Sequence, residues 1–125
     1  MLAAPTWAVV GCSDDPRRTS YAIAEFLQRN GKRIIPVNPH CTEILGETCY
    51  PSLAEVPEPI DVVDVFRRSA LAGEVADAAI AVGARAIWFQ LGVVDQGAYE
   101  RARAAGVDMV MDTCPKIEWA AHGPR

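Results

Sequence analysis

The stretch that decides the fold is Trp7-Ala8-Val9-Val10-Gly11-Cys12-Ser13, in which an apolar run ends at a glycine. Four consecutive apolar residues fit a strand that is covered on both faces, as strands of a parallel sheet are. Gly11 permits a sharp turn, and residues 19–30 then carry apolar side chains three and four positions apart, as a helix does. The stretch therefore predicts a buried strand, a tight turn and a helix.

The same alternation continues along the chain. Short apolar runs bounded by Gly, Pro, Asn or Asp predict strands at residues 7–10, 33–37, 61–66, 86–89 and 107–111. Helical spacing and capping residues predict helices at residues 19–30, 51–56, 70–82, 96–105 and 115–121. We therefore expect an α/β fold, a Rossmann-like doubly wound sheet of about five parallel strands with helices on both faces. Alternation alone leaves the order of the strands open.

Particular residues mark the expected helix ends. Thr19 or Ser20 can cap the first helix, and Asp95 precedes the helix at residues 96–105. Ser52 stands three residues before Glu55, which is the spacing of a capping box. Thr19 or Ser20 and the Ser52–Glu55 pair are expected to bond to the first turns of their helices, and Asp95 marks where its helix starts.

Composition excludes several classes of protein. The chain has 125 residues, half of them apolar, which predicts one domain over residues 1–125 and leaves no room for separate cofactor and substrate domains. Twelve basic against sixteen acidic residues argue against a nucleic-acid partner. No apolar run approaches the roughly 20 residues of a membrane span. Residues 1–6 lack the basic start of a signal peptide, so a cytoplasmic location is predicted.

The four cysteines contain no C-x-x-C pair and are expected to be free thiols.

Ligands of such sheets bind at the carboxyl ends of the strands. The loops at these ends are residues 11–18, 38–43, 67–69, 90–95 and 112–115. The first loop combines Gly11 and Ser13 with a helix start at Thr19 and Ser20, whose N–H groups attract phosphate. We interpret this loop as a pyrophosphate cradle, with an ordinary turn and helix cap as the alternative.

Two observations argue against NAD. The dinucleotide fingerprint needs three glycines, but Gly11 is the only glycine before Gly31. The second predicted strand ends at Asn38, where an acidic residue would be required to hold the ribose of NAD.

Two arginine pairs follow predicted strands, Arg17-Arg18 and Arg67-Arg68. A guanidinium group can bind two phosphate oxygens at once, so two pairs at one edge favour a polyanionic small molecule over solvated surface charge. Phe66 could flank an adenine ring or belong to the core. Pro39 stiffens its loop and predicts a fixed wall.

Catalytic groups are few. His40 lies in a loop, His122 lies in a tail, and His40-Cys41 with Cys49 lacks a fourth ligand for structural zinc, so no metal is expected. Cys114 precedes a predicted helix start, where a thiolate is stabilised. It is either a reactive thiol or a partly buried structural cysteine.

Five motifs occur in order along the chain: Val9-Val10-Gly11-Cys12-Ser13, Ile35-Pro36-Val37-Asn38-Pro39, Val65-Phe66-Arg67-Arg68, Trp88-x-Gln90-Leu91-Gly92 and Met111-Asp112-x-Cys114-Pro115-Lys116-Ile117-Glu118. With them the chain resembles the small stand-alone CoA-binding proteins over residues 7–118. Their domain is similar to the CoA-binding domain of the succinyl-CoA synthetase α-subunit.

The resemblance implies a Rossmann-like sheet of strand order 3-2-1-4-5, with coenzyme A lying across the strand ends. It implies that Gly11, Ser13, Arg17 and Ser20 serve the phosphates, in a loop that also holds Cys12 and Arg18. It further implies that the nucleotide is bordered by Asn38, Pro39, Phe66, Arg67 and Arg68, and that Gln90 and Gly92 lie toward the pantetheine arm. A phosphate on the ribose of CoA accounts for arginine pairs without the acidic residue of an NAD site.

The chain also departs from the family. Only residues 1–6 precede the first strand, and a missing N-terminal helix would expose part of the sheet or leave it to a partner subunit or a second copy of the chain. The related ligase uses a phosphorylated histidine on a separate domain that this chain lacks.

Three hypotheses about function follow. The first is a protein that binds CoA or an acyl-CoA without catalysis, as a carrier, sensor or accessory subunit. The second is a small enzyme or enzyme subunit of acyl-CoA or thiol chemistry that uses Cys114. The third is a nucleotide-binding module for NAD or another adenylate, and tighter binding of NAD than of CoA would select it.

Overall fold

A parallel sheet forms the centre of the computed structural model, which describes residues 1–122. Its strands are β1 (Thr6–Val10), β2 (Arg33–Val37), β5 (Val62–Val65), β6 (Ala86–Phe89) and β7 (Asp108–Val110). They lie in the order β2-β1-β5-β6-β7, and every neighbouring pair is parallel. The α/β Rossmann-like fold expected from the alternation is confirmed.

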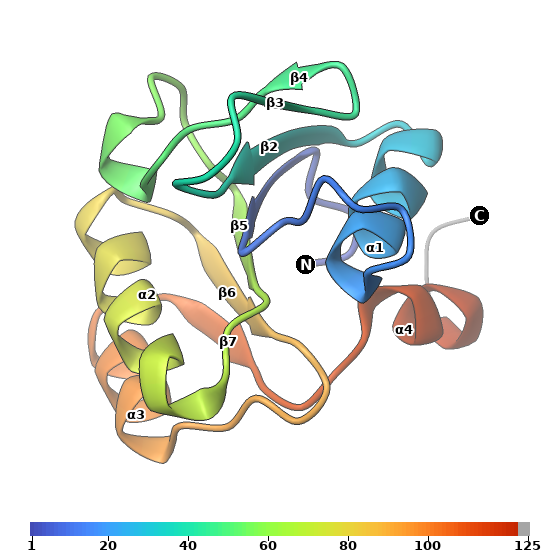
Figure 1. Ribbon diagram of the computed structural model, residues 1–125. Coiled ribbons are helices and arrows are strands. Elements are labelled where there is room, and N and C mark those ends of the chain that lie inside the picture. The colour runs from blue at the N-terminus through green and yellow to red at the C-terminus, as the bar shows by residue number, and fades with distance from the viewer. Residues whose placement is uncertain (123–125) are drawn as a thin grey trace.

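Helices cover both faces of the sheet (Figure 1). The helices are α1 (Thr19–Arg29), α2 (Ser69–Ala81), α3 (Gln96–Ala104) and α4 (Pro115–His122). In Figure 1, α2 and α3 lie together on one side of the sheet, and α1 and α4 lie on the other. A two-stranded hairpin, β3 (Glu43–Ile44) and β4 (Glu47–Thr48), and one 3-10 turn, η1 (Leu53–Glu55), complete the described elements. None of the helices within residues 1–122 is long and apolar enough to cross a bilayer.

The strand order is close to the one that the resemblance implies and differs from it in one strand. Counted along the chain, the five strands lie in the order 2-1-3-4-5, because β5 pairs with β1 instead of lying outside β2. The position outside β2 is taken by Tyr50, which forms a single parallel bridge with Val37. Its backbone accepts a bond from the N–H of Asn38 (2.9 Å) and donates one to the carbonyl of Pro36 (3.0 Å).

Alternate strand residues build two separate cores. On the side of α2 and α3, strand residues such as Val63 and Phe89 pack against alanines of α2. On the side of α1 and α4, Trp7 and Trp88 approach with ring centroids 5.6 Å apart and pack against Leu27. Almost every residue of β1, β5 and β6 is therefore buried, which explains their nearly continuous apolar sequence.

Both caps expected from the sequence are wrong, whereas the helix expected to start after Asp95 does so. The Asp95 carboxylate accepts a hydrogen bond from the Ala98 N–H (3.0 Å) and caps α3. The capping box is not formed, because Ser52 precedes a single 3-10 turn and makes no side-chain cap bond. Helix α1 has the extended Arg18 as its cap residue, so Thr19 and Ser20 lie inside the helix and do not cap it.

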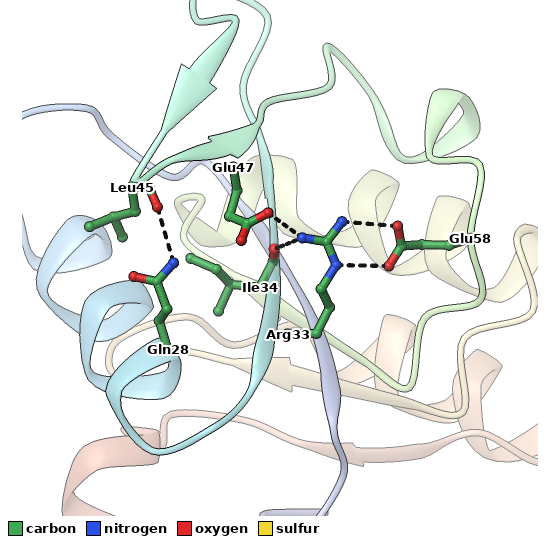
Figure 2. Close-up of polar contacts among 6 residues, drawn as sticks. All are labelled: Gln28, Arg33, Ile34, Leu45, Glu47 and Glu58. Atoms are coloured by element: carbon green, nitrogen blue, oxygen red, sulfur yellow. Dashed lines mark hydrogen bonds and ion pairs between the residues drawn. The ribbon is translucent and has the colours of Figure 1, made fainter.

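A charged clamp holds the hairpin against the edge of the sheet (Figure 2). Arg33, at the start of β2, donates two 3.0 Å bonds to the Glu58 carboxylate and another bond to Glu47 of β4. On the neighbouring helix, the Gln28 amide donates to the Leu45 carbonyl at 3.0 Å. These contacts fix the loop that follows β2, which forms one border of the candidate site.

One ionisable side chain, that of an aspartate, lies in the middle of the sheet. Asp64 of β5 is paired in register with Val9 and Trp88 and is 0% exposed. Neither of its carboxyl oxygens has a hydrogen-bond partner in the structure, and burial raises the pKa of Asp64 well above its usual range. Burial therefore favours the neutral, protonated form of the Asp64 side chain in the folded protein.

This burial predicts how the stability depends on pH. The folded protein holds the Asp64 proton to a higher pH than the unfolded chain, which releases it above about pH 4, so this residue makes the fold less stable as pH rises from there to the raised pKa of the folded state. Between about pH 4 and the raised pKa of the folded state, the unfolding free energy of Asp64→Asn relative to the natural protein should rise by about 1.4 kcal/mol per pH unit. Urea unfolding of both proteins at several pH values measures the difference. Asp108→Asn, at an exposed position of β7, controls for the loss of one charge, and a difference independent of pH would contradict the prediction.

Candidate functional site

Three adjoining hollows lie at the carboxyl ends of β1, β2, β5 and β6. The loop hollow is lined by Gly11, Ser13, Arg17, Arg18, Thr19, Ser20 and Phe66. The arginine hollow is lined by Thr19, Phe66, Arg67, Arg68, Gln90, Leu91, Gly92 and Val93. The apolar slot is lined by Val10, Val37, Pro39, Pro51, Ser52, Leu53, Arg67, Glu74, Val75 and Ala78. Phe66 and Arg67 are shared between hollows and join them into one continuous region.

Gly11 sets the distance between the loops after β1 and β5. Its φ is +83°, and a Cβ added to it would lie 2.4 Å from the carbonyl oxygen of Phe66. Its N–H donates to the Val37 carbonyl of β2 at 2.9 Å. Only glycine satisfies both the backbone angle and the close approach. The predicted sharp turn is therefore present, and it brings three strand ends together.

The loop after Gly11 is held in place by its own hydroxyl and carboxylate groups. The Ser13 N–H donates to the Ser20 hydroxyl (2.9 Å), and the Asp15 N–H donates to the Ser13 hydroxyl (3.0 Å). Helix α1 has neither a side-chain cap nor an acidic residue in its first turn. The backbone N–H groups at its start are thus available to an anion.

The four arginines are not equivalent. Arg17 pairs with Asp15, its guanidinium and backbone N–H donating to that carboxylate at 3.0 to 3.1 Å, although its side chain is 89% exposed. In contrast, among residues 1–122, Arg18, Arg67 and Arg68 form no ion pair with Asp or Glu. Arg67 is half-buried between the arginine hollow and the apolar slot. Of the four arginines that the sequence predicts at the site, three therefore have a guanidinium group that is not paired with a carboxylate of residues 1–122 and can bind a ligand.

Asn38 holds two loops together. Its amide nitrogen donates to the Cys12 carbonyl at 2.8 Å, and its amide oxygen accepts from the His40 N–H at 2.9 Å. Both ends of the side chain are thus engaged by backbone groups of the protein. Its neighbour Pro39 lines the apolar slot, as expected of a fixed wall.

The loop after β6 is fixed at both ends. The Gly92 N–H donates to the Asp112 carboxylate (2.7 Å), and the Ser69 hydroxyl joins the Gly92 carbonyl (3.3 Å) to the Val94 N–H (2.9 Å). At its start, Gln90 is only 6% exposed, and its amide oxygen Oε1 has no hydrogen-bond partner in the structure. A buried acceptor without a partner is costly, so a donor from a ligand would stabilise this wall of the arginine hollow.

The cysteines lie in the core of the α1 side. Cys12 is fully buried, and burial is the main cause that raises its pKa to about 12, so it stays a thiol at neutral pH. Cys12 therefore contributes backbone to the site and directs its side chain into the apolar cluster. Cys114 is 8% exposed and packs in the same cluster as Trp88. Within the described part of the chain, no three His, Cys, Asp or Glu side chains are arranged to hold a metal ion.

One wall of the candidate site was not expected from the sequence. Ser52, Leu53, Glu74, Val75 and Ala78 line the apolar slot, although none of them was expected near a ligand. The helical periodicity of residues 70–82 places Val75 and Ala78 on the apolar face of α2. Which strand ends this face reaches depends on the position of β5 beside β1, which the sequence did not reveal.

Comparison with known proteins places the chain in a family. The model of the family described as the CoA-binding domain matches residues 5–120. The chain belongs to the CoA-binding domain family. YneT of Bacillus subtilis, a protein named as uncharacterized, is 42% identical over 113 residues, which are 90% of this chain and 84% of YneT. A solved structure of a hypothetical protein from Pyrococcus horikoshii is 36% identical with a TM-score of 0.88, covering 92% of this chain and 81% of that one.

A larger relative shares only part of the domain. The ADP-forming acetate–CoA ligase II of Archaeoglobus fulgidus is 37% identical over 57 residues, which are 44% of this chain and 8% of the ligase. The CoA-binding domain therefore occurs both in proteins of this size and as a small part of a ligase.

The turn of this CoA-binding domain yields a matched pair of variants. Gly11 and Gly31 both have φ +83°, but a Cβ at Gly31 would meet nothing within 4 Å. Gly31→Ala should cost about 1 to 2 kcal/mol of unfolding free energy for its backbone angle alone. Gly11→Ala should cost about 1 to 3 kcal/mol more, because its methyl group collides with the Phe66 carbonyl. Urea unfolding of the two variants measures the gap, and equal losses would show that the close approach is unimportant.

Proposed function

We propose that this protein binds coenzyme A or an acyl-CoA and acts as a carrier, sensor or accessory subunit without a reaction of its own. Membership of the CoA-binding domain family and the form of the site support this proposal. CoA is an extended molecule with a flat base, a phosphorylated ribose, a pyrophosphate and a pantetheine arm. Such a ligand needs a series of adjacent binding surfaces that differ in polarity, and the three adjoining hollows offer such a series.

The phosphates are assigned to the loop hollow and the arginines beside it. The uncapped start of α1 offers backbone N–H groups, and Arg18 lies directly before it. Arg67 and Arg68 line the next hollow without carboxylate partners among residues 1–122. Guanidinium groups in such positions gain more from a phosphate than groups already paired with a carboxylate, as Arg17 is.

The base and the pantetheine arm are assigned to the other two hollows. The apolar slot has Pro39 and Leu53 among its walls and suits the faces of a flat ring. In the arginine hollow, Leu91 and Val93 offer apolar contact to a flexible arm, and Gln90 lacks a hydrogen-bond donor that an amide N–H of pantetheine would supply.

The observation that carries the proposal is the position of Arg67. This half-buried, uncommitted guanidinium lies between the apolar slot and the arginine hollow. A phosphate bound there would stand between a base in the slot and an arm in the hollow, as the sequence of groups in CoA requires. A non-catalytic role is supported by the cysteines, since the Cys12 thiol has a pKa of about 12 and Cys114 is packed in the core.

An accessory role also requires a surface for a partner subunit or a second copy of the chain. Leu91 and Val94 are 53% and 48% exposed at the edge of the arginine hollow. A contiguous exposed apolar patch can mark a surface that another protein covers, and we propose these two side chains as the candidate contacts of such a partner.

Calorimetric titration of the ligand-free protein with CoA, and then with NAD, tests the proposal. We expect stoichiometric binding of CoA and no response to NAD. Tighter binding of NAD would select the nucleotide-module hypothesis, and no binding of CoA would refute the proposed function. Turnover of an acyl-CoA that is lost in Cys114→Ser would instead favour an enzyme.

Replacing the arginine pair should weaken CoA binding strongly. If both residues make charge-assisted bonds to phosphate, Arg67→Ala together with Arg68→Ala should cost about 2 to 4 kcal/mol, which is roughly 30- to 1,000-fold in Kd. The matched control is Arg85→Ala with Arg103→Ala, which removes the same charge from residues outside the three hollows. Equal affinities of the two double variants, measured by the same titration, would contradict the site assignment.

A further inference from the structure

The wall of the apolar slot is mostly apolar, but it includes a few polar side chains. Of the residues that line it, only Ser52, Arg67 and Glu74 are polar, and the others are aliphatic or proline. Pockets of this kind use their few polar groups to fix the orientation and identity of a ligand. If Arg67 is taken by a phosphate, Glu74 and Ser52 are the side chains that remain to contact the edge of a bound base.

Glu74 is available for such a contact. It lies on α2 one residue before Val75, which also lines the slot, and its side chain is exposed. Among the described residues it takes part in no ion pair, whereas Asp77 on the same helix pairs with Arg101 of α3 at 2.8 Å. A carboxylate accepts hydrogen bonds and donates none. Glu74 therefore favours a ligand edge that carries an N–H donor.

We infer that Glu74 determines the specificity of the slot for a 6-aminopurine. This inference rests on the proposed function and deepens it. The exocyclic amino group of adenine would donate to the Glu74 carboxylate at the mouth of the slot. A 6-oxopurine presents a carbonyl oxygen at the same place, and two acceptors that face each other repel and leave both without a donor.

Binding of CoA is compared with binding of deamino-CoA, in which hypoxanthine replaces adenine and the rest of the molecule is unchanged. The natural protein should prefer CoA by roughly tenfold in Kd, as expected for one partly exposed hydrogen bond to a charged acceptor. In Glu74→Gln the preference should fall to about twofold or less, because a glutamine amide can both accept from the amine and donate to the carbonyl.

Asp77→Asn is the matched control, since it removes the same charge from the same helix at a residue that does not line the slot. It should retain the tenfold preference. Provided that the natural protein binds CoA, three results would overturn the inference. They are an unchanged preference in Glu74→Gln, an equal loss of preference in both variants, and no preference in the natural protein. No binding of CoA by the natural protein would instead refute the proposed function itself, and the inference with it.

Discussion

The loops after β1 and β5 approach each other so closely at Gly11 and the Phe66 carbonyl that only glycine fits at this point. No side chain fits between them, because a Cβ at Gly11 would lie 2.4 Å from that oxygen. From this point, the chain after β1 turns into α1 on one face of the sheet, and the chain after β5 turns into α2 on the other. The crevice that forms where neighbouring connections leave in opposite directions is the usual ligand site of open α/β sheets. The three hollows all border this crevice.

Around this contact, the protein distributes its charges in two ways. At the periphery, Arg29, Arg33, Arg85 and Arg101 pair with carboxylates of the protein, and Arg33 pairs with both Glu58 and Glu47. At the crevice, Arg18, Arg67 and Arg68 have no carboxylate partner within residues 1–122. Because the net charge of the chain is −4, these three unpaired arginines are a local concentration of positive charge in an acidic protein. A polyanionic ligand would supply the pairing partner that these three arginines lack.

The fold also contains polar groups that no part of the described protein satisfies. Asp64 is buried beneath the crevice on the α1 side, and Gln90 lies in the wall of the arginine hollow. They differ in their consequence. Asp64 belongs to the sheet interior and lowers stability as pH rises, whereas Gln90 borders a hollow where a ligand can supply the missing donor. The unsatisfied carboxyl group of Asp64 thus costs stability, whereas the unsatisfied amide oxygen of Gln90 indicates that a ligand there would carry a hydrogen-bond donor.

The sequence by itself determined the class of fold, the extent of most elements and the loops that border the candidate site. It did so because strands buried on both faces must be nearly all apolar, and because local residues such as Gly11 and Asp95 dictate turns and caps. Only the tertiary structure decided that β5 lies beside β1, since alternation of strands and helices does not encode which strands are neighbours. It also decided which polar side chains are committed: Asn38 to two backbone groups, and Arg17 to Asp15. Glu74 came to line the slot for the same reason, because the position of a helix relative to distant strand ends depends on packing between residues far apart in the chain.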